Sequence, residues 1–303
     1  MSGITKMIKK KIRKDCGLET KSGKGLTLAA IGISLAWTLI AVNEFEKQAL
    51  TYANYEIDTG GRIQDDTRIV FLSDLHETEF GSNNEKLLKK IYDADPDLIL
   101  MGGDMITVPK DVYQHPEKLS VDVALSLCRK LAEKYPVFYA PGNHEQRLDE
   151  KRFEEELKEA GVRYLFDKTV LYKDILIKGL YIDEQYYKPV KPPKMTTEYI
   201  YGHVGQPSDK HFSILMAHNP LYTEAYANSG MDLVLSGHFH GGTIRLPGDV
   251  GLMTPQFQFF SDKVVGMKQI GSGKQIISSG LGTHSINIRI NDKPQVVVVD
   301  LKK

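Results

Sequence analysis

Five apolar runs in this chain are each followed within three residues by side chains of a kind that binds metal ions. The runs are RIVFLS (68–73), DLILMG (97–102), VFYA (137–140), FSILMA (212–217) and DLVLSG (232–237). Amphipathic stretches at 84–94, 121–134 and 149–161 lie between the first four, and this alternation is typical of a layered α/β fold. After residue 240 the segments VVGMKQI, KQIISS, SINIRI and QVVVVDL predict further strands separated by turns.

The side chains that follow these runs are carboxylates, imidazoles and one amide. They are Asp74 and His76, Asp104, Asn143 and His144, His218, and His238 and His240. Ligands of open α/β sheets bind outside the carboxyl ends of the strands, so we expect the five clusters to converge there. Both Asp-x-His and His-x-His place two side chains on one side of an extended segment. Imidazole and carboxylate without thiolate suit zinc, iron or manganese.

Each cluster is weak evidence when it is taken singly. A lone Asp-x-His or Gly-Asp is more often structural, and a single histidine such as His218 is usually an ordinary core or surface residue. The joint occurrence is more specific, because five of the nine histidines fall in these clusters. The remaining four are interpreted as loop or surface residues without a role: His115, His203, His211 and His284.

The series Asp74-x-His76, Gly103-Asp104, Gly142-Asn143-His144-Glu145, His218 and Gly237-His238-Phe239-His240 resembles the calcineurin-like metallophosphoesterase superfamily. The resemblance covers roughly residues 67–300. The fuller strings SDLHETEFG and LSGHFHGGTIRLPG resemble its branch of bacterial membrane-anchored phosphodiesterases. The fold that the resemblance implies is α/β, an α+β sandwich of two facing mixed β-sheets flanked by helices.

The resemblance also implies a centre of two divalent or transition metal ions (Mn, Zn or Fe). Asp74, His76 and His240 would hold one ion, Asn143, His218 and His238 would hold the other, and Asp104 would bridge them. In such a centre, the two ions bind a phosphoryl group and activate water for attack on phosphorus. Thr107 stands where purple-acid relatives carry an iron-binding tyrosine, which disfavours that subclass.

His144 is the candidate catalytic residue, because it follows a ligand and is not needed as one. It can stabilise charge or protonate the leaving oxygen. Many relatives place an aspartate soon after the Gly-Asp to orient this histidine, whereas here Thr107 follows and the next carboxylate is Asp111. The orientation of His144 therefore stays open at this point.

A metal-dependent phosphoesterase, acting on phosphodiesters or pyrophosphates more than on monoesters, is the predicted function. One alternative is a non-catalytic scaffold that binds a partner, although none of the seven ligands is missing. Another is an amide-cleaving metallohydrolase, which would need a different ligand order. The substrate is a small-molecule or lipid-linked phosphoester. Two polar, proline-bearing segments, 105–120 and 184–211, are candidate loops over the site, the second including Tyr186, Tyr187 and Lys188.

Residues 25–43 contain no charged side chain, and a helix of that length spans close to the roughly 30 Å core of a bilayer. Eight basic residues precede it within positions 1–24, so the positive-inside rule places them in the cytoplasm and the rest outside. We expect an uncleaved signal anchor in the cell membrane. The alternatives are a buried core helix, and a signal peptide cleaved after Ala53.

The predicted organisation is a basic cytoplasmic N-terminus (1–24), a transmembrane anchor (25–43), a polar stalk (44–66) and a catalytic domain (67–303). Beyond residue 24 the chain carries 31 basic and 37 acidic groups. No basic patch interleaved with aromatics follows the N-terminus, so nucleic acid is not an expected partner, and no protein partner is inferred. Two cysteines, Cys16 and Cys128, exclude a disulfide framework, and Cys128 is expected to be a small buried apolar residue.

Overall fold

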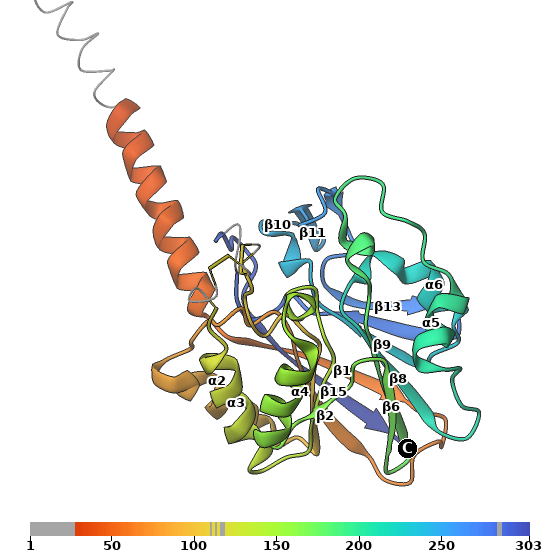
Figure 1. The fold of residues 1–303 in the computed structure, drawn as a ribbon. Coiled ribbons are helices and arrows are strands. Elements are labelled where there is room, and N and C mark those ends of the chain that lie inside the picture. Colours follow the sequence, from red (N-terminus) through yellow and green to blue (C-terminus); the bar gives the residue numbers. More distant parts are fainter. Residues whose placement is uncertain (1–27, 110, 113, 116–118, 284–286) are drawn as a thin grey trace, which may run out of the picture. The chain divides into compact units, whose positions relative to one another are not determined.

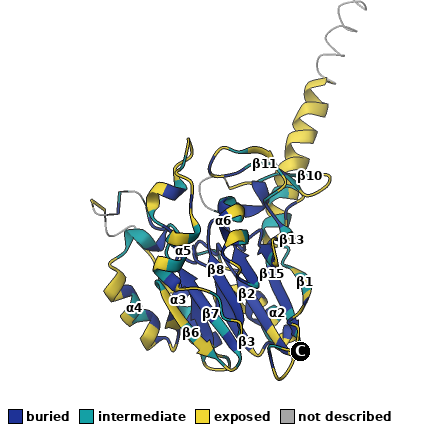
Figure 2. Ribbon diagram, turned by 90° about the vertical axis from the view of Figure 1, so that its right-hand side faces the viewer, coloured by how far each residue is buried: buried dark blue, intermediate teal, exposed yellow. Residues whose placement is uncertain are grey.

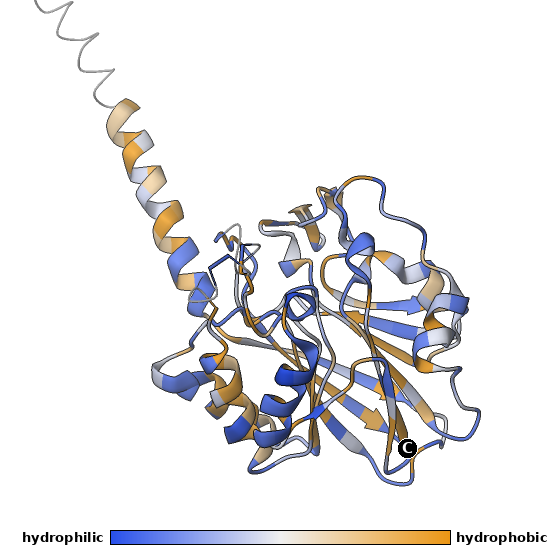
Figure 3. Ribbon diagram, in the orientation of Figure 1, coloured by the Kyte–Doolittle hydropathy of each residue, from blue (hydrophilic) through white to orange (hydrophobic). Residues whose placement is uncertain are grey.

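The computed structural model describes residues 28–109, 111–112, 114–115, 119–283 and 287–303. The chain divides into two compact units, Met1–Phe45 and Glu46–Lys303. An apolar helix, Leu28–Gln48, begins in the first unit and is long and apolar enough to cross a membrane. Figure 3 shows the hydrophobic residues along this helix. Its large apolar side chains are exposed, whereas all the buried apolar residues among those described lie in the second unit. The second unit therefore contains a complete core of its own. The basic residues 1–24 and the first three residues of the predicted anchor lie outside the described residues.

Two six-stranded mixed sheets form the second unit (Figure 1). The first has the order β1 (Thr51–Asp58), β15 (Gln295–Lys302), β2 (Thr67–Leu72), β3 (Leu98–Met101), β4 (Val137–Tyr139), β5 (Arg163–Tyr164). The second has the order β13 (Gly266–Ile270), β14 (Gly273–Ile277), β9 (Leu233–Ser236), β8 (Phe212–Ala217), β7 (Ile175–Leu180), β6 (Lys168–Tyr172). Strands β2 to β5 are mutually parallel, as are β14, β9, β8 and β7. The predicted pair of mixed sheets is confirmed.

Helices cover the outer face of each sheet. They are α2 (Glu85–Ala94), α3 (Asp122–Ala132) and α4 (Glu150–Glu159) on the first, and α5 (Thr197–Val204) and α6 (Thr223–Asn228) on the second. Short 3₁₀ turns are η1 (Ser82–Asn84), η3 (Glu145–Arg147), η4 (Glu184–Tyr187), η5 (Pro220–Tyr222) and η6 (His240–Gly242). A third, small sheet is formed by β10 (Arg245–Leu246), β11 (Val250–Met253) and β12 (Phe259–Ser261).

The core is layered because side chains alternate across each strand. In β2, Val70 and Leu72 pack against the helices, while Ile69 and Phe71 join the core between the sheets. Strands covered on both faces read as unbroken apolar runs, which is why the sequence predicted β2, β3, β4, β8 and β9 within a residue or two. Figure 2 shows these central strands as the buried interior of the unit.

Three expectations differ from the structure. The predicted stalk contains β1, which pairs along its whole length with β15, from Thr51 opposite Gln295 to Asp58 opposite Lys302. Every second residue of this edge strand is exposed, and Ile57 alone is fully buried. Its sequence TYANYEID therefore resembles a polar linker. The candidate loop 184–211 contains α5, and residues 287–290 of the SINIRI segment form one isolated bridge at Ile290 in place of a strand.

Candidate metal centre

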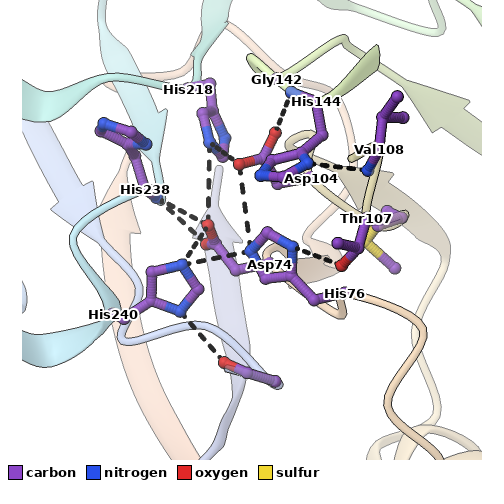
Figure 4. Close-up of polar contacts among 12 residues, drawn as sticks. Asp74, His76, Asp104, Thr107, Val108, Gly142, His144, His218, His238 and His240 are labelled. Carbon is purple, nitrogen blue, oxygen red and sulfur yellow. Dashed lines mark hydrogen bonds and ion pairs between the residues drawn. The ribbon is translucent and has the colours of Figure 1, made fainter. Parts of the chain in front are cut away.

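The predicted ligands converge where strands of both sheets end (Figure 4). Asp74 and His76 follow β2, Asp104 follows β3, His218 follows β8, and His238 and His240 follow β9. Five of these residues have left-handed backbone conformations, with φ between 45° and 67°: Asp74, His76, Asp104, His238 and His240. Such conformations are uncommon for residues other than glycine and cluster at functional sites. Here they turn each side chain sharply away from the direction of its strand.

The first group of potential ligands is Asp74, His76 and His240, whose donor atoms all lie within 4.8 Å of one another. The Nε2 atoms of His76 and His240 are 3.2 Å apart, and His240 Nε2 is 3.5 Å from Asp74 Oδ1. The two rings are stacked, with an interplanar angle of 24°. This is the set that the resemblance assigned to one ion.

The second group is Asp104, His218 and His238, again within 4.8 Å. Asp104 Oδ2 lies 3.1 Å from His218 Nε2 and 3.9 Å from His76 Nε2, so this carboxylate lies between the two groups. That is the position a bridging ligand needs. His76, Asp104 and His144 form a further group within the same distance limit.

The buried polar atoms fit a metal-binding role. Asn143 Oδ1 is buried without a hydrogen-bond partner among the described residues, and the buried Asp104 Oδ2 and His218 Nε2 pair only with charged groups of the same centre. Buried polar atoms are nearly always satisfied, and a coordinated cation would satisfy all three. Asn143 follows β4 and stands directly before His144, whose N–H binds Asp104 Oδ1 at 2.8 Å.

Backbone carbonyls fix the orientation of two histidines. His218 Nδ1 is 2.7 Å from Gly102 O, and His240 Nδ1 is 3.0 Å from Gly282 O. A carbonyl only accepts, so in each ring Nδ1 carries a proton and Nε2 is the nitrogen directed toward the centre. His238 is held through its backbone N–H, which donates to both oxygens of Asp74 at 2.9 and 3.1 Å.

The carboxylates give the centre a strong preference for positive charge. Burial opposes ionisation of Asp104, but His218 and His144 hold its pKa well below the usual range. Burial likewise disfavours protonated His218, yet the charges of Asp104 and Asp74 raise its pKa to about 10. The same carboxylates that hold a proton on His218 would stabilise a metal ion in its place.

His144 is oriented by the backbone. Its Nδ1 accepts a hydrogen bond from the N–H of Val108 at 2.9 Å, and its ring meets that of His76 edge-on, with centroids 4.9 Å apart. Burial lowers the pKa of His144. The residue is therefore a neutral imidazole with its proton on Nε2, which answers the question of orientation that the sequence left open.

Three residues without a predicted role support the centre. Glu145, part of the Gly-Asn-His-Glu string, accepts from the backbone N–H groups of Asp104, Met105 and Gly142 and from the Tyr139 hydroxyl. Tyr187, from a candidate loop, lies with its ring 4.9 Å from that of His238. Arg289 is fully buried and donates to Gly282 O, the carbonyl that also binds His240. No feature of the sequence singled out Arg289.

The other described histidines lie outside these groups. His203 Nδ1 is 2.6 Å from Asp167 Oδ2, and neither His115 nor His211 belongs to any of the three ligand groups found among the described residues. His284 lies outside the described part of the chain.

Comparison with known proteins gives a consistent result. The sequence profile described as calcineurin-like phosphoesterase matches residues 67–242. The uncharacterized metallophosphoesterase YkuE of Bacillus subtilis is 29% identical over 242 residues, which cover 78% of this chain and 80% of the relative. The phosphodiesterase YaeI of Escherichia coli is 27% identical over 250 residues, covering 77% and 82%. Among solved structures, a dimetal phosphatase from Danio rerio has a TM-score of 0.42 at 10% identity, covering 71% and 88%.

Proposed function

The chain belongs to the calcineurin-like phosphoesterase family, and we propose that it hydrolyses phosphodiesters or pyrophosphates at a centre of two metal ions. The observation that carries this proposal is the pair of ligand groups that meet at Asp104. One buried carboxylate within 3.9 Å of imidazoles from both groups is the arrangement expected of a bridging ligand.

We assign the ligands in two sets around this bridge. Asp74, His76 and His240 would hold one ion, and Asn143, His218 and His238 would hold the other. The chemistry that two such ions supply is positive charge against the phosphoryl oxygens and a lowered pKa for water. Their identity among Mn, Zn and Fe is left to measurement, because imidazole, carboxylate and amide ligands suit all three.

The chain's own residues position the ligands and supply a proton donor. The carbonyls of Gly102 and Gly282 hold His218 and His240 with Nε2 directed inward. His144 presents an Nε2 proton, and one of its ring nitrogens lies within 4.8 Å of the donor atoms of His76 and Asp104. It is therefore placed to donate a hydrogen bond to a phosphoryl or leaving oxygen.

Two observations support the finer assignment. The relative YaeI is named a phosphodiesterase, which favours diesters over monoesters. The helix Leu28–Gln48 supports attachment to the cell membrane, with the Glu46–Lys303 unit on the extracytoplasmic side as the charge of residues 1–24 predicts. Such an anchor raises the local concentration of the enzyme at lipid-linked or envelope phosphoesters, which we take as the substrate class.

A metal-bound scaffold without turnover is the competing function, and one experiment separates the two. The Glu46–Lys303 unit is purified, its metals are counted by elemental analysis, and hydrolysis of an aryl phosphodiester and an aryl phosphomonoester is measured with added Mn²⁺. We expect about two equivalents of metal, faster cleavage of the diester, and loss of both metal and turnover in His218→Ala. Folded, metal-loaded protein without turnover would establish the scaffold instead.

A further inference from the structure

A hairpin with exposed aromatic side chains projects from the second unit. Residues 254–263, here called the aromatic hairpin, include the turn after β11 and strand β12. Phe257, Phe259 and Phe260 are 58%, 61% and 66% exposed. Phe257 and Phe260 have left-handed backbone conformations, with φ of 55° and 54°. Three large apolar side chains that are each more than half exposed thus lie close together in the sequence, and such exposed apolar surface marks a site of interaction.

The base of this hairpin is fixed to a basic loop. Gln256 is buried, and its side-chain amide donates to the carbonyls of Tyr186 and Lys188 at 3.1 Å each. The loop continues as KPVKPPK (188–194), in which Val190 is 73% exposed and all three lysines are exposed. With Lys263 the hairpin and loop carry four lysines against one aspartate, Asp262, which pairs with Lys268 at 2.8 Å. Exposed apolar side chains flanked by lysines are the composition of surfaces that bind anionic lipid.

The chain enters the second unit beside the same small sheet. Glu46 accepts a hydrogen bond from the backbone N–H of Asp292 at 3.1 Å, and the Asp292 carboxylate pairs with Arg245 of β10. Strands β10, β11 and β12 form one sheet, so the entry point and the aromatic hairpin belong to one end of the unit. Only Ala49 and Leu50 separate the apolar helix Leu28–Gln48 from β1. The chain that leaves the apolar helix therefore enters the second unit at this end.

We propose that the aromatic hairpin and the loop 188–194 form a surface that binds a phospholipid bilayer rich in anionic headgroups. The proposal rests on the membrane attachment included in the proposed function. The phenylalanines enter the boundary between headgroups and acyl chains, and the lysines of the loop bind headgroup phosphates.

One segment of the chain contacts both this surface and the metal centre. Tyr187 lies against His238, while the carbonyls on either side of it, those of Tyr186 and Lys188, hold the aromatic hairpin. One short segment thus links the lipid-facing surface to a potential metal ligand. A phosphoester in the headgroup layer would meet the centre without leaving the membrane, which points to lipid-linked phosphoesters within the proposed substrate class.

Vesicle flotation of the isolated Glu46–Lys303 unit tests the surface without the anchor. We expect the unit to float with vesicles of phosphatidylcholine and phosphatidylglycerol, and several-fold less with phosphatidylcholine alone. The triple substitution Phe257→Ser, Phe259→Ser, Phe260→Ser should reduce flotation at least tenfold, as should Lys188→Gln, Lys191→Gln, Lys194→Gln at low salt. The matched control is Leu171→Ser, which removes a side chain of β6 that is 52% exposed on another sheet, and it should float like the parent.

The outcomes that would overturn the proposal are clear. The proposal is wrong if the parent unit does not float, or if the triple phenylalanine variant floats as well as the parent. It is also wrong if the unit is a dimer in solution and the triple variant is a monomer, because the phenylalanines would then form a dimer interface. Turnover of a soluble aryl phosphodiester keeps this test separate from the proposed function. It should be unchanged in the triple variant, so loss of flotation with full turnover concerns the surface alone, whereas loss of turnover in the parent concerns the metal centre.

Discussion

The Nδ1 atom of His144 accepts a hydrogen bond from the backbone N–H of Val108, and this bond fixes the ring proton on Nε2. An aspartate beside the histidine would do the opposite, because a carboxylate only accepts and would leave the proton on Nδ1. Burial lowers the pKa of the ring more than the charge of nearby Asp104 raises it. The centre therefore holds a neutral hydrogen-bond donor at His144.

The first prediction concerns this hydrogen bond. Val108→Pro removes the donor, and we expect kcat to fall about tenfold while the metal content is unchanged, because the ring loses its fixed tautomer. His144→Ala should lower kcat by about 10²- to 10⁴-fold. Val108→Ala keeps the N–H and should stay within about twofold of the parent. Steady-state kinetics and elemental analysis of the three variants measure kcat and the metal content, and so test the role of this hydrogen bond. Equal rates for the proline and alanine variants would contradict it.

The second prediction concerns Glu145. Its carboxylate accepts from three backbone N–H groups in the loops that carry Asp104 and Asn143. Glu145→Ala leaves these buried donors unsatisfied and should lower the free energy of unfolding by about 3–5 kcal/mol. Glu145→Gln keeps one of the two acceptor oxygens and replaces the other by an NH2 group that cannot accept, so it should also destabilise the fold, but by less than Glu145→Ala. Urea unfolding measures both, and two variants of equal stability would show that the acceptor is unimportant.

The third prediction compares two glycines. A Cβ at Gly142 would lie 2.3 Å from Asp104 Oδ1, so Gly142→Ala should displace the Asp104 carboxylate, weaken metal binding and destabilise the fold by about 1–3 kcal/mol. Gly202 in α5 is the control, because a Cβ there meets nothing within 4 Å. Gly202→Ala should stabilise the protein by about 0.5–1 kcal/mol and leave metal binding unchanged. Thermal unfolding and metal titration measure the stability and the metal affinity of the two variants. Equal metal affinity in both variants would contradict the prediction.

The fourth prediction concerns Tyr187, whose hydroxyl is buried without a hydrogen-bond partner among the described residues. Burial raises its pKa well above the usual value, so the phenol stays protonated and is a donor. If this hydroxyl binds a substrate oxygen, Tyr187→Phe should raise KM for an aryl phosphodiester by about fivefold to tenfold, the effect of one lost hydrogen bond. The unfolding midpoint should not fall, since no internal bond is lost. An unchanged KM would assign the tyrosine to packing against His238 only.

The fifth prediction concerns Cys128, the only cysteine of the Glu46–Lys303 unit. It is buried against Met101, as the sequence predicted, and burial raises the pKa of its thiol to about 12. The thiolate is the reactive form, so a thiol reagent at pH 8 should label the folded unit only as fast as it unfolds. The unfolded thiol ionises near 9 and the folded one near 12, so this group destabilises the fold as pH rises between these values. Labelling by mass spectrometry, with urea as the positive control, would contradict this if the folded unit reacted at once.

The centre was predictable because its residues follow buried parallel strands. Such strands are apolar on both faces, so RIVFLS and DLVLSG stand out in the sequence, and the polar residues after them mark the same end of each sheet. The family resemblance carried by these residues was confirmed by the match over residues 67–242. Strand β1 was missed because its polar alternation becomes a strand only through pairing with β15, far along the chain.

Contacts made by backbone groups were not predictable. Val108 orients His144 through its N–H, a group that every residue except proline carries, so the side chain at 108 gives no sign of it. Arg289 contacts the carbonyl of Gly282 only because the fold brings the two groups together, and the sequence around Arg289 resembles no motif. Side chains that touch metal are readable in a sequence, whereas the groups that orient them depend on the completed fold.

The position of β15 has a consequence for how the protein is made. This strand lies between β1 and β2 in the first sheet, so Thr51 can pair with Gln295 only after a further 244 residues have been synthesised. A nascent chain in which β2, β3 and β4 have been synthesised still exposes the edge of β2 that will pair with β15. Unpaired strand edges of this kind can pair with other chains and aggregate. We expect the unit to acquire its native sheet only after synthesis has passed residue 295, and chains halted earlier to become substrates for proteases.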